Sequence, residues 1–306
     1  MTQLLYLECT SGISGDMAAA ALLDLGADEA AVRRAMESLP VEGFSIEVTR
    51  VVKSGLDVCD FNVVLDDAHD NHDHDMAYLH GAAADACAEE HGHGHDRVHG
   101  SNHEHGHRHD HGHDHGHDHG HDHGRAGHHS GVHHHRGPAD IEALIDGADM
   151  TPGAKALARS MFGYVARAEA RAHGVPLSEV HFHEVGAVDS IADIVAIAVA
   201  ADSLGVDGVV VGDLPCGRGT VRCQHGVIPV PAPATVFIAE EAGLVLAPSE
   251  VEGELVTPTG AAVAAALRTQ AALPERFTVQ RIGMGAGKRA YDTPGILRAL
   301  LIEPQE

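Results

Sequence analysis

The sequence predicts a mixed α/β (α+β) fold, in which a sheet-and-helix domain is interrupted by a long disordered insertion. Short apolar runs typical of buried strands alternate with longer segments whose apolar residues recur at helical spacing. Between them, in residues 68–138 (the histidine-rich tract), the composition changes abruptly, and 24 of the 28 histidines lie there. We therefore expect residues 1–67 and 139–306 to form the folded domain.

The first part of the chain predicts the order strand, helix, helix, strand, strand. Leu4–Leu7 is a short apolar run, and after a glycine-containing turn an alanine-rich helix ends near Gly26. A second helix is expected over residues 29–39. The runs 45–52 and 60–65 partly alternate between apolar and polar side chains and are joined by a short glycine-containing segment, which is typical of a β-hairpin.

The histidine-rich tract repeats His-Asp-His-Gly almost without variation. It has too few apolar groups to offset the entropy lost on ordering, so we expect it to be disordered. Neutral imidazoles at alternating positions of a flexible chain bind nickel, zinc and copper alike. The tract therefore indicates divalent-metal handling without selecting the metal, and mild acid should release the ion. An expansion without function, or one used only for storage, is the alternative.

The remainder of the chain predicts helices and strands in close alternation. The second of its helices opens with Thr151 as N-cap and Pro152 as its first residue. Glycine-rich segments at 214–220 and 283–289 are expected to be a turn and a loop. The expected helices cover residues 140–147 and 151–174, a segment from about 189 to 204, and segments that begin near 233 and 258; the expected strands cover residues 208–212, 277–282 and 296–302.

Two imidazoles and three carboxylates lie within the thirteen residues from His181 to Asp193. In an extended segment His181 and His183 project to one side, while Glu184 points the other way unless the chain turns. Asp189 and Asp193 are four residues apart and share one face of a helix. Nitrogen and oxygen donors together suit nickel, zinc, or a catalytic metal with open positions.

A structural interpretation of the two aspartates is equally good. Ser190-x-x-Asp193 resembles a capping box with Asp in place of Glu or Gln, and the helix dipole favours Asp189 in a first turn. For His181, His183 and Glu184 we favour a functional site over a structural role. His225 heads a rigid segment with prolines at 229, 231 and 233. It is a further candidate metal ligand, although a lone histidine is more often structural.

Two strand-turn-helix segments are candidate anion sites, because helix N-termini present backbone N–H groups to an anion. The first contains Ser11, Gly12, Ser14 and Gly15, and Asp16 there would suit a cation held beside the anion. The second contains Thr257, Thr259 and Gly260. In both segments ordinary helix capping, by Ser14 and by a threonine, is the alternative. Lys288 and Arg289 can meet a phosphate, or they belong to a solvated loop.

Composition excludes several classes of protein. The formal charge of −25, an aromatic content of 3% and the absence of tryptophan argue against a nucleic-acid partner and for affinity toward cations. No apolar run is long enough to span a membrane, and the N-terminus lacks the design of a signal peptide. Five scattered cysteines do not suggest a disulfide framework. We therefore expect a cytoplasmic protein without membrane contact.

Taken together, the motifs resemble the LarC-type nickel insertion proteins. They are, in order, Ser11-Gly-Ile-Ser-Gly-Asp-Met17, the histidine-rich tract, His181-Phe-His-Glu-Val-Gly186 with Asp189 and Asp193, His225-Gly-x-x-Pro-Val-Pro-Ala-Pro-Ala-Thr235, Thr257-Pro-Thr-Gly260 and Gly283-x-Gly-x-Gly287. The resemblance implies insertion of nickel into pyridinium-3,5-bisthiocarboxylic acid mononucleotide, which forms the nickel-pincer cofactor of lactate racemase-type enzymes. It also implies the use of CTP and of manganese or magnesium.

The resemblance implies a nickel chelatase, a metal-inserting lyase. Insertion requires a ring carbon to lose a proton, so we expect Glu184 or His183, the nearest candidates, to act as the base. The serine–glycine turn becomes a candidate contact for a phosphate or its metal. Family members continue into a C-terminal domain associated with CTP binding and oligomerisation, whereas this sequence stops at Glu306. We therefore expect either a separate C-terminal domain as partner or a shortened homologue, and a homo-oligomer is left open. The alternative function is a non-catalytic nickel or zinc storage protein or metallochaperone.

Overall fold

The computed structural model describes residues 2–66, 76, 79, 136–180, 182, 188–223 and 225–305. Most of the histidine-rich tract, and with it the expectation of disorder, lies outside the described residues. The first part of the chain confirms the predicted order, and the turn of its hairpin has positive φ at both central residues, 52° at Ser54 and 79° at Gly55, as a type I′ turn requires. Its elements are β1 (Leu4–Glu8), α1 (Gly15–Leu25), α2 (Glu29–Ser38), β2 (Phe44–Lys53) and β3 (Leu56–Leu65).

The rest of the chain is likewise a mixture of helices and strands. As expected, Thr151 caps α6 by accepting a hydrogen bond from the Ala154 N–H at 3.0 Å. None of the helices in the described residues is long and apolar enough to cross a membrane. The elements are α5 (Pro138–Gly147), α6 (Pro152–His173), a 3-10 turn η1 (Leu177–Glu179), α7 (Val188–Ser203), β4 (Gly208–Val211), β5 (Leu214–Arg218), β6 (Thr220–Cys223), β7 (Gly226–Pro229), α8 (Pro233–Ala242), β8 (Leu246–Glu252), α9 (Pro258–Leu267), β9 (Phe277–Ala286) and β10 (Ile296–Pro304).

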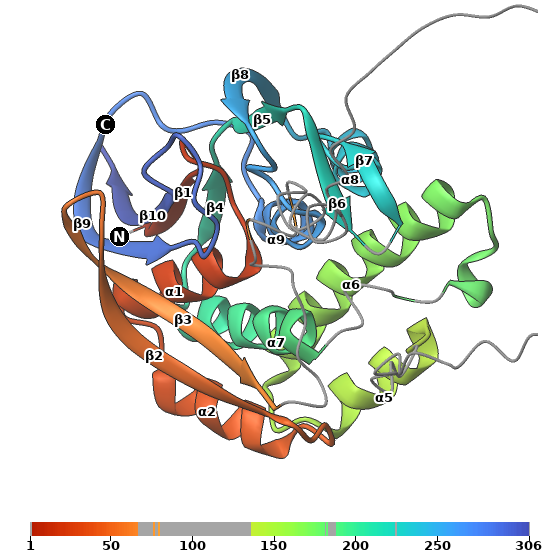
Figure 1. Cartoon of the computed structure of the whole chain (residues 1–306). Coiled ribbons are helices and arrows are strands. Elements are labelled where there is room, and N and C mark those ends of the chain that lie inside the picture. The colour runs from red at the N-terminus through yellow and green to blue at the C-terminus, as the bar shows by residue number, and fades with distance from the viewer. Residues whose placement is uncertain are drawn as a thin grey trace, which may run out of the picture.

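The main sheet joins strands from both ends of the sequence. It has six strands in the order β2-β3-β9-β10-β1-β4. β1 pairs antiparallel with β10 on one side and parallel with β4 on the other. β3 meets β9 in parallel through Cys59 and Gly285. The N-terminal hairpin and the last hairpin therefore form one continuous sheet, with β1 in its interior (Figure 1).

Helices pack on this sheet in successive layers. α1 lies against β3, β9 and β10, and α7 lies behind α1 and also contacts α2 and α6. α6 in turn packs on α8 and α9. The layers can approach closely because Ala18–Ala21 of α1 are fully buried and small. This arrangement brings the first turns of α1, α7 and α9 to a common place.

Two glycine-rich segments are largely strands, which corrects the predicted turn at 214–220 over residues 214–218 and the predicted loop at 283–289 over residues 283–286; residues 287–289 do belong to the loop between β9 and β10. Residues 214–218 form β5 and pair in parallel with β8, and β9 continues through Gly283 and Gly285 to Ala286. A Cβ on Gly283 would lie 2.2 Å from the Ala21 carbonyl oxygen, and one on Gly285 would lie 2.1 Å from that of Met17. These two glycines mark a close approach between β9 and α1, which is a recognised role of glycine within a strand.

Candidate functional site

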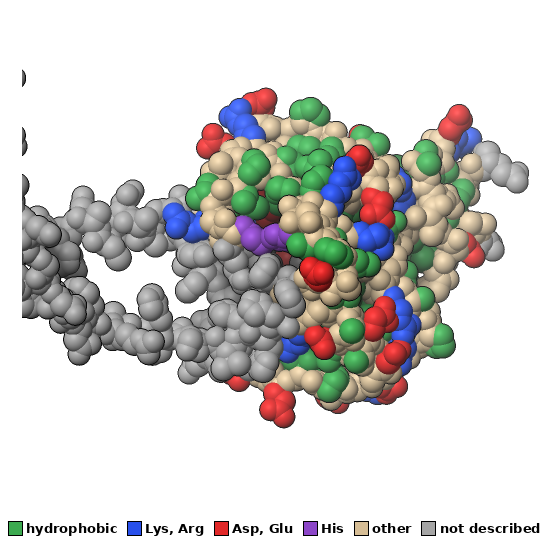
Figure 2. Space-filling view, turned by 90° about the vertical axis from the view of Figure 1, so that its right-hand side faces the viewer, with side chains coloured by type: hydrophobic (Ala, Val, Ile, Leu, Met, Phe, Trp, Pro, Cys, Tyr) green, Lys and Arg blue, Asp and Glu red, His purple; other side chains and the backbone are tan. Residues whose placement is uncertain are grey.

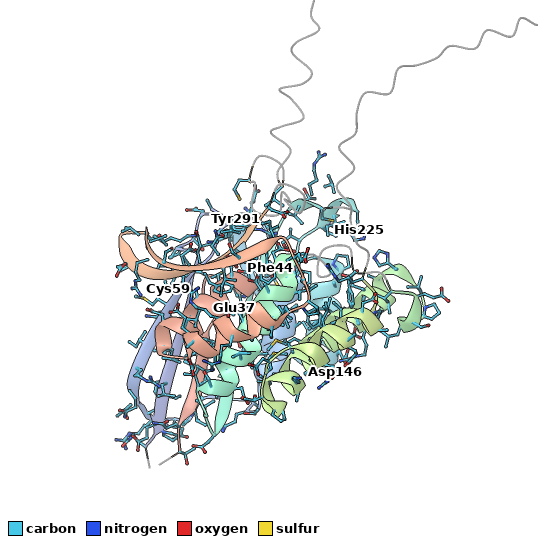
Figure 3. The ribbon with its side chains drawn as sticks, turned by 90° about the horizontal axis from the view of Figure 1, so that it is seen from below. Glu37, Phe44, Cys59, Asp146, His225 and Tyr291 are labelled. Atoms are coloured by element: carbon cyan, nitrogen blue, oxygen red, sulfur yellow. The ribbon has the colours of Figure 1, made fainter. Side chains whose placement is uncertain are left out.

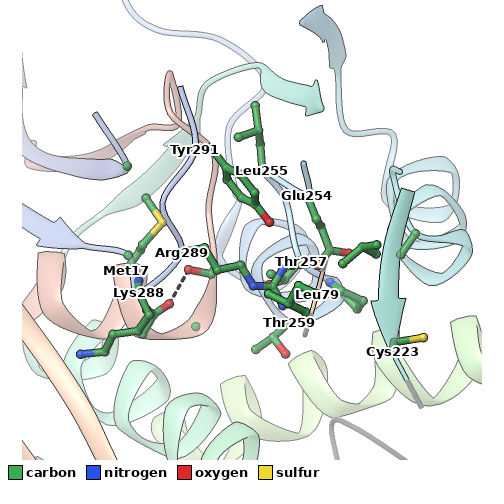
Figure 4. A pocket seen from close by; sticks show the side chains of 18 of the residues that line it. Met17, Leu79, Cys223, Glu254, Leu255, Thr257, Thr259, Lys288, Arg289 and Tyr291 are labelled. Atoms are coloured by element: carbon green, nitrogen blue, oxygen red, sulfur yellow. Dashed lines mark hydrogen bonds and ion pairs between the residues drawn. The ribbon is translucent and has the colours of Figure 1, made fainter. Parts of the chain in front are cut away.

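A cavity of about 120 Å³ opens where α1, α7 and α9 begin. The hairpin β6–β7 and the loop between β9 and β10 close its other sides (Figure 4). Of the residues singled out from sequence, it is lined by Ser11, Ser14, Gly15, Asp16, Asp189, Asp193, Thr257, Thr259, Lys288 and Arg289. The structure thus gathers motifs that lie more than 240 residues apart in the sequence.

The two anion-site candidates are bound to each other through their backbones. The Ile13 N–H donates to the Leu255 carbonyl oxygen at 3.0 Å, and the Thr257 N–H donates to the Ile13 carbonyl oxygen at 3.2 Å. A Cβ on Gly12 would lie 2.0 Å from the Leu255 oxygen, and one on Gly260 would lie 2.0 Å from the Ile13 oxygen. Gly12 and Gly260 therefore allow two helix N-termini to lie side by side.

The hydroxyl groups of the two turns differ in role. Thr257 Oγ1 accepts a hydrogen bond from the Gly260 N–H at 3.0 Å, so this threonine caps α9. Ser14 occupies the N-cap position of α1, but its side chain makes no capping hydrogen bond and donates instead to Asp16 Oδ1. The capping interpretation is confirmed for Thr257 and wrong for the Ser14 hydroxyl.

Three carboxylates face the same cavity. Asp16 is only 8% exposed, and its Oδ2 accepts a hydrogen bond from the Lys288 N–H at 3.0 Å. The Asp193 carboxylate lies against Gly15, where a Cβ would be 2.2 Å from Oδ2. α7 begins at Val188, so Ser190 lies inside the first turn, and the predicted capping box of Ser190 and Asp193 is wrong. Asp189 does lie in that first turn, as the dipole interpretation expected.

Burial raises the pKa of the Asp193 carboxyl well above its ordinary value, and the negative charges of Asp16 and Asp189 raise it further, while Lys288 acts in the opposite direction. A like-charged neighbour and loss of water both disfavour the ionised form. The deprotonated cluster is therefore costly in the absence of a cation. A divalent ion in the cavity would remove much of that cost.

We expect Asp193→Asn to increase the free energy of unfolding by about 1 kcal/mol at pH 7.5. A carboxyl whose pKa is raised by folding destabilises the protein once the pH exceeds the unfolded-state value, 3.8. The difference between variant and wild type should therefore shrink as the pH falls toward 3.8. Urea unfolding of both proteins at pH 7.5 and pH 5 measures this difference in the free energy of unfolding, with a chelator present to keep metal ions out of the cavity. An equal or larger gain at pH 5 would contradict the assignment.

Cationic side chains on the loop between β9 and β10 reach the other side of the cavity. Lys288 Nζ pairs with Asp60 Oδ1 at 2.5 Å, and Arg289 pairs with Glu254, which is 6% exposed. Lys53 fixes the loop by donating to the carbonyl oxygens of Gly287 and Arg289. The interpretation of Lys288 and Arg289 as a solvated loop is wrong, since both side chains are only 19% exposed.

Sequence reasoning missed Glu254 and Tyr291. The Tyr291 ring covers Gly253, where φ is 125° and a Cβ would lie 2.2 Å from the ring. Burial raises the pKa of its phenol. Glu254 stands three residues before the capping Thr257. A carboxylate just ahead of a helix N-terminus is the signal that could have indicated it, whereas Tyr291 carries no comparable pattern.

Of the predicted imidazole ligands, only His225 is among the described residues, and it does not line the cavity. His181, His183 and Glu184 lie outside the described residues. His225 is described; it stands in the turn of the hairpin β6–β7, above the C-terminal end of α6, with its ring 4.8 Å from that of His173 (Figure 3). Within the part of the chain that the structure describes, no three His, Cys, Asp or Glu side chains are arranged to hold a metal ion.

Comparisons with known proteins place the chain among relatives. The model of the family described as "Nickel insertion protein" matches residues 5–306. The pyridinium-3,5-bisthiocarboxylic acid mononucleotide nickel insertion protein of Alkaliphilus metalliredigens is 43% identical over 99% of this chain and 61% of its own length. The protein of the same name from Akkermansia muciniphila is 37% identical over 100% of this chain and 61% of its own length.

A relative from Geobacter sp. named as a putative nickel insertion protein is 36% identical over 98% of this chain and 62% of its own length. The chain thus spans about three fifths of the curated relatives it matches. No solved structure was found to match. Because the family model extends over almost all of the sequence, the chain belongs to the nickel insertion protein family.

Proposed function

We propose that this chain takes part in inserting nickel into pyridinium-3,5-bisthiocarboxylic acid mononucleotide, to form a nickel-pincer nucleotide cofactor of the kind used by lactate racemase. The names of the relatives support the reaction. We further propose that the reaction uses CTP and that CTP binds to the part of those relatives that the match does not cover. A domain that corresponds to that part of the relatives is the proposed partner, and a homo-oligomer is compatible with the proposal.

One observation carries the proposal: groups that favour an anion and groups that favour a cation line the same cavity. The N-termini of α1 and α9 and the cations Lys288 and Arg289 favour a phosphate. Asp16, Asp189 and Asp193 line the same cavity and favour a cation. A mononucleotide that receives a metal ion needs both kinds of group within one site.

Each side of the cavity has a chemical task. The phosphate would be held by backbone N–H groups at Ser14–Asp16 and near Thr259, which orients the ring. Carboxylate oxygens are the donors that manganese or magnesium prefers, so the donor type fits the divalent ion proposed to act with CTP, although the three side chains would have to draw closer together to bind it. Bond formation between nickel and a ring carbon requires that carbon to lose a proton, and Glu184 or His183 is the proposed base.

The alternative, a nickel or zinc storage protein or metallochaperone, is favoured by the composition of the histidine-rich tract. The two functions make different demands on the chain. Storage depends on the imidazoles of the tract, whereas insertion depends on the cavity. Leu79 is buried and lines the cavity, so a deletion that leaves the cavity intact must begin after His80.

The experiment replaces residues 81–135 by a Gly-Ser linker and supplies the substrate, excess nickel, CTP, manganese and the region of the relatives that the match does not cover. We expect mass spectrometry to detect the nickel-loaded product at an undiminished rate. Asp189→Asn should slow its formation at least about tenfold. Asp146→Asn, an exposed carboxylate in α5, is the control. Absence of product with the wild-type chain, together with loss of nickel binding on deletion, would favour storage.

A further inference from the structure

The hairpin β6–β7 carries a sulfur and an imidazole that face each other. Cys223 ends β6, and His225 lies in the turn before β7. Cys223 Sγ lies 3.7 Å from His225 Nδ1, and the backbone N–H of His225 donates to the same sulfur at 3.4 Å. The ring of His173, at the end of α6, packs beside that of His225.

The spacing of these two atoms fits a shared metal ion. A tetrahedral ion with a sulfur ligand at about 2.3 Å and a nitrogen ligand at about 2.0 Å holds the two ligand atoms about 3.5 Å apart. The observed separation of Sγ and Nδ1 is 3.7 Å. The N–H group that points at Sγ stabilises the thiolate, which is the form that binds metals. The pair is thus close to ligand geometry before any ion arrives.

The donor types select a different ion from the one that suits the carboxylates. Thiolate and imidazole favour nickel or zinc, whereas carboxylate oxygens favour magnesium or manganese. Cys223 therefore offers nickel a ligand that Asp16, Asp189 and Asp193 do not provide. An ion bound through sulfur and nitrogen is also better matched to a substrate that will hold it by two sulfur atoms.

The position of the pair connects the surface with the cavity. Cys223 lines the cavity, and in Figure 4 it lies at the opposite end from Lys288. Histidine side chains are visible on the outer face of the molecule in Figure 2. An ion held between Cys223 and His225 would therefore lie at the rim, in reach of both solvent and the cavity.

We propose that Cys223 and His225 are the two protein ligands of a loading site, at which a nickel ion waits before it enters the cavity; the role in loading rests on the proposed function. Two protein ligands leave positions for water and for the sulfur atoms of the substrate. Such a site releases its ion more readily than a closed site with four protein ligands, as a transfer requires. His173 beside His225 limits the rotation of that imidazole.

The binding test uses the full chain and nickel(II) alone. Iodoacetamide labelling, resolved by peptide mass spectrometry, should show nickel slowing the alkylation of Cys223 roughly tenfold when its free concentration is ten times the dissociation constant. His225→Ala should abolish this protection and leave Cys223 reactive. Cys216, which is also partly exposed, is the internal control. Equal labelling of Cys223 with and without nickel, or protection that survives His225→Ala, would overturn the proposal.

A second measurement separates this inference from the proposed function. If the chain inserts nickel, Cys223→Ser should slow product formation at limiting nickel, and excess nickel should restore the rate; Cys216→Ser should have no effect at either concentration. A defect that persists at excess nickel would assign Cys223 to the chemistry and not to loading. If no variant or wild-type chain inserts nickel, the proposed function fails, while the labelling result still decides whether the nickel site exists.

Discussion

Gly260→Ala is expected to reduce the free energy of unfolding by about 2–3 kcal/mol, because it overpacks a backbone contact. The added Cβ would lie 2.0 Å from the carbonyl oxygen of Ile13 and 3.0 Å from the backbone nitrogen of Ser14. Neither backbone atom can move without shifting the N-terminus of α1 away from that of α9. Urea unfolding followed by circular dichroism measures the loss, and the same displacement should abolish product formation in the nickel-insertion assay.

Gly147→Ala is the matched control. Gly147 is the last residue of α5, and a Cβ there meets nothing within 4 Å. Alanine at such a position should be neutral or should stabilise the protein by up to about 1 kcal/mol, since it reduces the entropy of the unfolded chain. If both variants unfold at the same urea concentration, the inference that the N-termini of α1 and α9 pack closely at Gly260 is wrong.

Arg289→Ala is expected to destabilise the protein by about 3–5 kcal/mol, because it leaves a buried charge without its partner. Glu254 is only 6% exposed and pairs with the Arg289 guanidinium. The loop between β9 and β10 loses the same contact, so this side of the cavity should open. The midpoint of urea unfolding at neutral pH reports the effect.

Arg218→Ala and a double variant test the origin of that loss. Arg218 and Glu250 form an ion pair whose side chains are 54% and 92% exposed, so its removal should cost less than about 1 kcal/mol. Adding Glu254→Gln to Arg289→Ala removes the buried charge and should recover more than half of the lost stability. Similar midpoints for Arg289→Ala and Arg218→Ala would show that burial of the Arg289–Glu254 pair does not increase its contribution to stability.

Much of the fold could be predicted because local signals and tertiary packing agree. The cap at Thr151 and the alternation in β2 and β3 act over a few residues, and the structure confirms both. The glycines of β5 and β9 led to a wrong prediction, because the role of a glycine in a strand depends on the backbone that packs against it. Gly285 resembles a loop residue until the helix that packs on it is known.

The candidate site was predictable in part for the same reason. Asp16, Asp189 and Thr257 stand at helix beginnings, where sequence patterns are strongest, and all three line the cavity. Glu254 and Tyr291 depend on contacts across the fold, which no local pattern encodes. Cys223 carried no signal alone, since its relation to His225 depends on the tight hairpin turn between them.

The place of β1 inside the sheet has a consequence for biosynthesis. One neighbour of β1, the strand β10, begins at residue 296, so the ribosome makes it long after β1 has emerged. Contacts between such distant segments slow folding, because a long stretch of chain must be closed before they form. The nascent N-terminal region therefore waits with an unpaired strand edge, and a chaperone that shields this edge should increase the yield of native protein.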